Sequence, residues 1–264
     1  MNRVRHCKRV VVISDLHCDH RVGLTPPTWQ IVDNKIYRHF LTFEKEVWRF
    51  YKDTIKEIQP IDILVVNGDC IDGKGERSGG TELLEADRNI QCDIAAECIS
   101  ICKAKEIVMV HGTPYHVGVT EDFERNVAEK VNAKKIGGHE WLDVNGTIFD
   151  FKHHIGSSTI PHGRATAILR DQLWNDLWSL DDGQPKADIL VRSHVHYHVY
   201  AGDPSHLVMT TPALMGYGSK YGIRKCSGKV DIGLVHFDVD NKGGYTWGSH
   251  ILKGDFLKVQ PIKL

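Results

Sequence analysis

Uninterrupted apolar runs alternate with segments of helical periodicity through the first half of the chain. The runs predict strands buried on both faces, because such strands carry no alternation of polar and apolar residues. They are RVVVIS (9–14), IDILVVN (61–67) and EIVMV (106–110). Apolar residues at helical spacing predict helices over 43–58, 81–104 and 120–133. This order of elements is typical of a layered α/β fold.

The second half of the chain is richer in predicted strands. Asn145-Gly146 lies between HEWLDV and TIFDFK and predicts a tight hairpin. A helix is expected over 163–180, then strands in ADILVR (187–192), HVYAG (198–202), HLVMTT (206–211), VDIGLVHFDV and YTWGSHIL. The pattern contains no clear linker, so we predict one domain over residues 1–264, with two sheets and flanking helices.

The helix expected over 163–180 carries four large apolar side chains: Leu173, Trp174, Leu177 and Trp178. They form either a packing stripe or a contact surface for a cofactor. Apolar residues at helical spacing usually face a core, so packing is the favoured interpretation.

The composition narrows the class of protein. A net charge of -1 gives no general attraction to nucleic acid, although a local basic patch stays open. The seven cysteines include no CxxC pair, which favours a reduced, cytoplasmic compartment. The apolar run near the N-terminus is too short for a signal peptide, and no segment reaches transmembrane length, so no membrane contact is expected.

Residue types that bind metals follow the predicted buried strands. In chain order they are Asp15 and His17, Asp69 and Asp72, His111 and His116, His153 and His154, and His194 and His196. Each alone is explained as a turn residue, a helix cap or a surface histidine. Sites in α/β sheets form at the carboxyl ends of strands, so the recurrence favours a metal site. Imidazole and carboxylate ligands suit manganese, iron or zinc better than calcium.

These motifs resemble those of the calcineurin-like metallophosphoesterases. DLH, GDCID, HH and SHVH are similar to the family's D-x-H, G-D-x-x-D, strand-end His and G-H-x-H motifs, in the expected order over residues 13–196. The resemblance implies a four-layer α/β/β/α sandwich of two mixed sheets flanked by helices. It also implies two divalent metal ions at the strand ends, with manganese favoured and iron or zinc as alternatives.

The resemblance further implies the ligand set. One ion would be held by Asp15, His17, Asp69 and His196, with Asp69 as the bridge. The other would be held by His153 and His194, and His154 is the alternative to its neighbour His153.

Two positions depart from the family's pattern. Thr113 stands where the family has the Asn of G-N-H, and His116 follows three residues later. This Gly-Thr-x-x-His variant is similar to that of bacteriophage-borne members. We expect Thr113 to contact the metal or substrate through its hydroxyl, with water as the alternative ligand, and His116 to act as general acid or transition-state stabiliser. Ser193 replaces a Gly before the paired histidines, and this small residue is expected to have no effect.

The resemblance implies that water activated by the metals hydrolyses a phosphate ester. We expect a phosphodiester, a nucleotide or a nucleic-acid end. Gly73 stands where the family's protein phosphatases carry Arg, which makes a Ser/Thr-type phosphatase the weaker alternative. A DNA exonuclease that binds strand ends stays open, since a near-neutral chain is unsuited to a long nucleic-acid footprint. The non-enzymatic alternative is a degenerate scaffold, which the nearly complete ligand set disfavours.

The segment GYGSKYGIRK (216–225) is expected to reach the active site. The chain runs away from His196 through HVYAG and returns through HLVMTT, so the loop from Pro212 to Gly228 arrives beside the metals. A solvated surface loop is the alternative. We predict that Lys220 and Arg224 hold a non-reacting anionic group of the substrate, and that a tyrosine of this loop stacks on a base if the substrate is a nucleotide.

Overall fold

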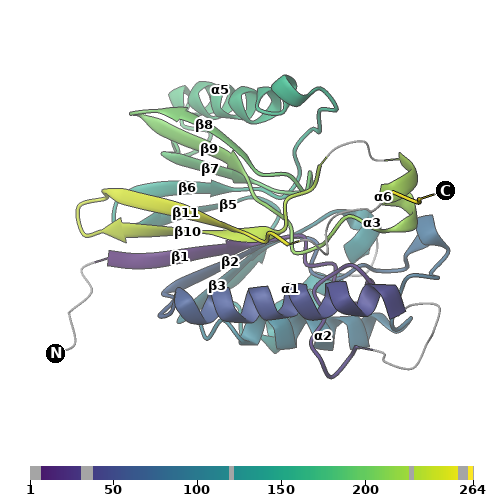
Figure 1. Ribbon diagram of the computed structural model, residues 1–264. Coiled ribbons are helices and arrows are strands. Elements are labelled where there is room, and N and C mark those ends of the chain that lie inside the picture. The colour runs from purple at the N-terminus through teal and green to yellow at the C-terminus, as the bar shows by residue number, and fades with distance from the viewer. Residues whose placement is uncertain (1–6, 31–37, 119–121, 226–228, 255–260, 264) are drawn as a thin grey trace.

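Two β-sheets lie face to face between layers of helices (Figure 1). The computed structural model describes residues 7–30, 38–118, 122–225, 229–254 and 261–263. The first sheet has six strands in the order β11-β10-β1-β2-β3-β4, and the second has five in the order β5-β6-β7-β9-β8. Helices α1 and α2 cover the outer face of the first sheet, and α5 covers the second (Figure 1). The predicted architecture of two mixed sheets flanked by helices is therefore confirmed.

The direction of the strands sets where their ends meet. The first sheet contains β1 (Cys7–Ile13), β2 (Ile63–Asn67), β3 (Glu106–Val110), β4 (Lys135–Gly137), β10 (Gly233–Asp240) and β11 (Tyr245–Ile251). The second contains β5 (Glu140–Val144), β6 (Thr147–Phe151), β7 (Ile189–Arg192), β8 (Val199–Asp203) and β9 (His206–Thr210). Strands β1 to β4 run parallel, as do β6, β7 and β9. Loops that follow parallel neighbours emerge at one edge of their sheet.

The helices differ from the expected ones mainly at their ends. They are α1 (Arg38–Glu57), α2 (Arg88–Ser100), α3 (Pro114–Val117), α4 (Phe123–Lys130), α5 (Thr166–Leu180) and α6 (Lys220–Lys225), with 3-10 turns η1 (Glu76–Ser78) and η2 (Pro161–Gly163). In the described part, no helix combines the length and the apolar character that crossing a bilayer requires.

The helix predicted over 81–104 was wrong at its start, since α2 begins only after Asp87. The side chain of Asp87 caps the helix by accepting a hydrogen bond from the Asn89 amide at 2.8 Å. The preceding residues bond to the loop after β1 instead: the Arg21 amide donates to the Glu82 carbonyl at 3.0 Å, and the Leu84 amide donates to the Asp19 carbonyl at 2.9 Å. These tertiary hydrogen bonds outweigh the local helical periodicity.

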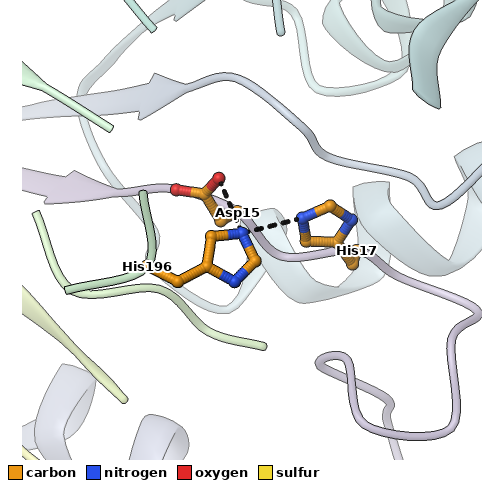
Figure 2. A group of neighbouring side chains, drawn as sticks. All are labelled: Asp15, His17 and His196. Carbon is orange, nitrogen blue, oxygen red and sulfur yellow. Dashed lines mark hydrogen bonds and ion pairs between the residues drawn. The ribbon is translucent and has the colours of Figure 1, made fainter. Parts of the chain in front are cut away.

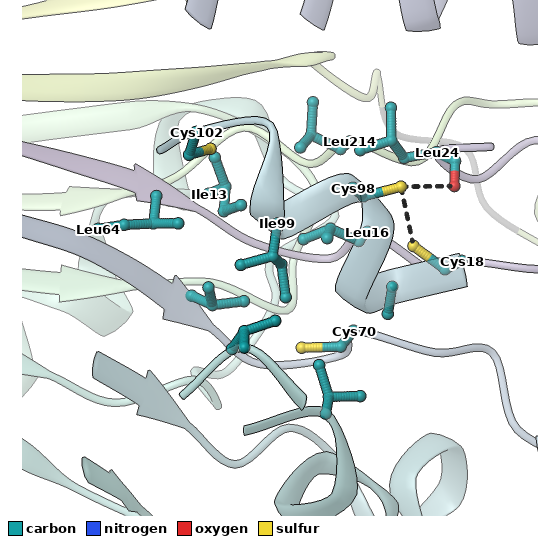
Figure 3. Close-up of a cluster of buried hydrophobic side chains, with 14 of the residues drawn as sticks. Ile13, Leu16, Cys18, Leu24, Leu64, Cys70, Cys98, Ile99, Cys102 and Leu214 are labelled. Atoms are coloured by element: carbon teal, nitrogen blue, oxygen red, sulfur yellow. Dashed lines mark hydrogen bonds between the residues drawn. The ribbon is translucent and has the colours of Figure 1, made fainter. Parts of the chain in front are cut away.

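Apolar side chains fill each interface between layers. Between the two sheets, Val10, Val12 and Phe237 pack with Phe149 and Val191. The outer core of the first sheet lies under the helices, where Figure 3 shows side chains of α2 over those of the strands and the loops that follow them. Its cysteines Cys18, Cys70, Cys98 and Cys102 are fully buried. Removal of this apolar surface from water is the main force that holds the layers together.

The predicted packing stripe on α5 was wrong. Leu173, Trp174, Leu177 and Trp178 are between 44% and 56% exposed. A polar residue takes the inward position instead, since Asn175 is buried and binds the Ala187 amide at 2.9 Å and the Pro185 carbonyl at 3.0 Å. The face of α5 that carries Asn175 and Ile168 is turned inward, and the leucines and tryptophans lie on the outer side.

Candidate metal centre

Loops from both sheets meet at one edge of the sandwich. They follow β1, β2 and β3 in the first sheet and β6 and β7 in the second. In chain order they carry Asp15 and His17, Asp69 and Asp72, Thr113 and His116, His153, and His194 and His196. Because these strands run parallel within each sheet, their carboxyl ends bring the predicted side chains together.

The side chains form overlapping groups whose ligand atoms lie within 4.8 Å of one another. One group is Asp15, His17 and His196, and another is Asp69, His153 and His194. A further group joins His17 and Asp69 to His116, for which the sequence predicted a catalytic role and no ligation. Since two residues are shared, the groups are parts of one continuous cluster.

Two imidazoles and a carboxylate converge in the first group. Figure 2 shows His196 between the other two side chains, with its Nε2 3.2 Å from Asp15 Oδ1 and 3.3 Å from His17 Nε2. His17 Nδ1 faces the Asp72 carboxylate at 3.2 Å, so the proton belongs on Nδ1 and the Nε2 lone pair points at the group. Asp15 Oδ1 is buried and faces the Nε2 atoms of His196 and His153, at 3.2 Å and 3.9 Å. This buried oxygen and the two nitrogens form a donor set that fits a divalent cation.

The second group is held by a backbone hydrogen bond. His153 Nδ1 donates to the Asn67 carbonyl at 2.7 Å, which leaves its Nε2 facing Asp69 Oδ2 at 3.1 Å. The His194 amide donates to Asp15 Oδ2 at 3.2 Å and ties this group to the first. His154, the alternative to His153, is exposed and belongs to none of the groups that the described residues form.

Unusual backbone conformations place these ligands. Asp15, His17, Asp69, His194 and His196 all have φ between 41° and 71°, in the left-handed region. Each such residue costs about 1–3 kcal/mol and persists only where its surroundings enforce it. Here the Asp15 amide donates to the Gly68 carbonyl and the His17 amide to the Asp69 carbonyl, both at 3.0 Å. A concentration of strained residues in one place is characteristic of a functional site.

Two glycines leave room for the ligands. A Cβ atom at Gly112 would lie 2.1 Å from Asp69 Oδ1, and one at Gly68 would lie 2.4 Å from His153 Nδ1. Gly68 also has φ +83°, which disfavours any side chain. Both positions therefore require glycine for the cluster to form.

The electrostatics keep the carboxylates ionised. Burial opposes ionisation of Asp15, but His196 and His153 outweigh it and lower its pKa to about 2. Burial also opposes ionisation of Asp69, yet His153 holds its pKa well below the usual range. Burial, assisted by His153, lowers the pKa of His194 to about 4. Anionic carboxylates and a neutral imidazole are the states in which these groups bind metal.

Two histidines behave differently, since burial at His196 is outweighed by the Asp15 carboxylate, which raises the pKa of that histidine. Burial alone would lower the pKa of His153, but the Asp69 and Asp15 carboxylates outweigh it and raise that pKa to about 10. A cation that binds His153 Nε2 must therefore displace a proton, so metal uptake is expected to weaken as the pH falls.

Asp72, which the sequence placed among the candidate metal-binding residues, lies outside the ligand groups that the described residues form. Its Oδ1 lies 3.2 Å from His17 Nδ1 and 3.5 Å from His116 Nδ1, and its carbonyl accepts from His116 Nδ1 at 3.0 Å. Asp72 thus orients a ligand and the predicted acid together. The second Asp of the G-D-x-x-D motif was the available signal.

Thr113 contacts Asp69, a member of two of the ligand groups. Its amide donates to Asp69 Oδ1 at 2.7 Å and its hydroxyl donates to the same oxygen at 3.0 Å. It is not among the residues that line the cavity, and the expected contact of its hydroxyl with a metal or substrate stays a prediction. In this structure Thr113 therefore holds Asp69 in place.

Glu124 of α4 joins the loops that follow β2 and β3. Its buried carboxylate accepts hydrogen bonds from the Cys70 amide at 3.0 Å and the Gly112 amide at 2.6 Å. We expect Glu124→Gln to lower the free energy of unfolding by about 1–3 kcal/mol, because the amide nitrogen would face a backbone donor. Urea unfolding measures this, with the exposed Glu129→Gln on the same helix as control. Equal stability of the two variants would contradict this role.

A cavity of about 460 Å³ opens beside the cluster. His17, Asp69, Asp72, His116, His194 and His196 line it. Since β9 runs parallel to β7, the chain returns to this edge as predicted, and Ser219 and Gly222 reach the cavity wall. The predicted loop contains the short helix α6. Arg224 is exposed and is not a lining residue, while the side chain of Lys220 lies outside the described part.

No family model matches the chain, and no curated protein matches it. Among solved structures, Vps29 from Cryptosporidium parvum is similar at 11% identity and a TM-score of 0.49, over 94% of this chain and 99% of that one. A Zn²⁺ complex of Vps29 from Entamoeba histolytica is similar at 15% identity and a TM-score of 0.41, over 92% of this chain and 98% of that one. A novel archaeal phosphodiesterase is similar at 11% identity and a TM-score of 0.45, over 92% of this chain and 99% of that one. Likenesses this low leave the activity to be inferred from the residues of the chain itself.

Proposed function

We propose that the chain is a metal-dependent phosphoesterase that binds two divalent ions and hydrolyses a phosphodiester, a nucleotide or a nucleic-acid end. The observation that carries this proposal is the pair of buried ligand groups beside one cavity. Asp69 Oδ2 lies 3.1 Å from His153 Nε2 and 4.0 Å from His17 Nε2, so it is suited to bridge two ions. The nitrogen and oxygen donors favour manganese, with iron or zinc as alternatives.

Divalent ions held here would supply a low pKa for bound water and charge stabilisation for phosphoryl oxygens. The chain provides the proton transfer. His116 lines the cavity, and its Nδ1 is held by the Asp72 carbonyl at 3.0 Å, so Nε2 is the atom left to protonate the leaving oxygen. Burial of the ligands, with Asp15 and Asp69 no more than 1% exposed, excludes bulk water from the charged cluster.

The wider setting is also part of this proposal. We place residues 1–264 in one domain. We also place the chain in a reducing, cytoplasmic compartment, and the free thiol of every cysteine in the described part of the chain supports this. The Gly-Thr-x-x-His motif supports a bacteriophage-type member. The substrate clamp of Lys220 and Arg224 stays a prediction.

A hydrolysis screen with added manganese tests the function. It compares a phosphomonoester, a phosphodiester, cyclic nucleotides, single-stranded DNA and a phosphopeptide. We expect a diester or nucleotide to be hydrolysed fastest. The phosphopeptide as the best substrate would favour a protein phosphatase, and single-stranded DNA an exonuclease. A chain that binds no manganese, iron or zinc by mass spectrometry and hydrolyses none of these esters would be a scaffold.

A further inference from the structure

An arginine lies in the cavity wall close to the first ligand group. Arg164 follows the η2 turn just before α5, and both Arg164 and Tyr197 line the cavity. The guanidinium carbon of Arg164 lies 4.4 Å from the centre of the Tyr197 ring. Tyr197 directly follows His196, which joins Asp15 and His17 in that group. The contact with Tyr197 thereby holds the Arg164 guanidinium beside the candidate metal cluster.

Arg164 has no anionic partner among the residues that the structure describes. Its Nε is buried and makes no hydrogen bond there. Lys229, a second cation of the wall, is paired with Asp231 at 3.4 Å, and its side chain is 80% exposed. A partly buried guanidinium loses hydration, and contact with one aromatic ring replaces little of it. Arg164 is therefore the cation of this wall best placed to receive an anion.

Hydroxyl groups accompany the guanidinium. Ser157 and Thr159, from the segment between β6 and α5, line the same cavity. The hydroxyl of Ser158 between them is used within the segment, where it donates to the Ile160 carbonyl at 3.2 Å. A planar guanidinium with hydroxyl donors is the combination that recognises phosphate oxygens.

We propose that Arg164, together with Ser157 and Thr159, binds a second phosphate group of the substrate. The substrate class is then a phosphate ester that carries another phosphate beyond the reacting one, such as a nucleoside bisphosphate or a phosphorylated strand end. This inference rests on the proposed phosphoesterase function of the same cavity. The volume of about 460 Å³ suits a ligand of that size.

Two nucleotides that differ by one phosphate test the subsite. Adenosine 5′-monophosphate and adenosine 3′,5′-bisphosphate are titrated calorimetrically into the 264-residue chain with manganese. We expect the wild type to bind the bisphosphate at least about tenfold more tightly, as a charge-assisted hydrogen bond allows. Arg164→Ala should abolish that preference. Arg164→Lys should retain part of it, since an ammonium keeps the charge and loses the planar fork.

Arg170→Ala is the matched control, because Arg170 is exposed on α5 and does not line the cavity. It should keep the full preference for the bisphosphate. Equal affinities in the wild type, or a preference that survives in Arg164→Ala, would overturn the subsite. Circular dichroism checks the fold of each variant. If Arg164→Ala does not fold, an undiminished preference in Arg164→Lys overturns the subsite instead.

A parallel measurement distinguishes failure of the proposed phosphoesterase function from failure of the phosphate subsite. Hydrolysis of p-nitrophenyl phosphate, bis(p-nitrophenyl) phosphate and both nucleotides by the wild type is measured in parallel. If the wild type hydrolyses none of them while the preference still depends on Arg164, the phosphate subsite stands and the phosphoesterase proposal falls. Hydrolysis with no dependence of binding on Arg164 gives the opposite conclusion.

Discussion

Asp69→Asn is expected to abolish hydrolysis while the protein stays folded. Asp69 is buried, and its oxygens contact His153, His17 and Thr113. The substitution removes the negative charge that would be shared by two ions. We expect kcat to fall by more than about 100-fold, since loss of residues that merely support a metal ligand already costs 10–100-fold. The fold should survive because the asparagine oxygen can still accept the hydrogen bond from the Thr113 amide.

The measurement combines turnover at saturating manganese with metal content by mass spectrometry. Asp69→Asn should bind less metal than the wild type and should give the same far-ultraviolet circular dichroism. Asp53→Asn is the control, since Asp53 is an exposed carboxylate on α1. Near-wild-type turnover of Asp69→Asn would rule out a dinuclear site bridged by this residue.

His116→Ala is expected to lower kcat by roughly 10²–10⁴-fold with little change in metal content. His116 lines the cavity and is positioned through the Asp72 carbonyl, which suits a proton donor. It also lies within ligand distance of His17 and Asp69. Metal analysis separates the two roles: loss of one metal equivalent would make His116 a ligand.

His111→Ala is the matched control for His116, because it changes the same residue type in the same segment between β3 and α4. His111 Nδ1 lies 3.6 Å from Asp122 and 3.7 Å from Glu124, and it neither lines the cavity nor joins a ligand group of the described residues. We expect it to keep most of the activity. A similar loss in both variants would point to damage to the loop and not to catalysis.

The sequence predicted β1, β2, β3 and β7, because burial on both faces leaves an unbroken apolar run, but it missed the short parallel strand β4. It also placed Asp15, Asp69 and His194 at strand ends, where the topology brings them together. It could not separate His153 from His154, because both follow directly after the predicted strand TIFDFK and either fits a strand-end histidine. In the structure the two separate through the hydrogen bond between His153 and the Asn67 carbonyl.

Other features depend on contacts between distant segments and leave no local pattern. Glu124 reads as an ordinary residue of an amphipathic helix, yet it bonds to loops 54 and 12 positions away. The inward position of Asn175 on α5 depends on the chain around Ala187. Arg164 gains its place only when the segment between β6 and α5 folds against Tyr197.

The left-handed conformations of the candidate ligand residues would bear on the affinity for a metal ion. A flexible cluster of side chains must lose conformational entropy when it closes around an ion. In this chain the backbone of Asp15, His17, Asp69, His194 and His196 is already confined when folding ends. Ordering of these loops therefore costs little of the free energy of ion binding. Exchange of one ion for another should leave the loops unchanged.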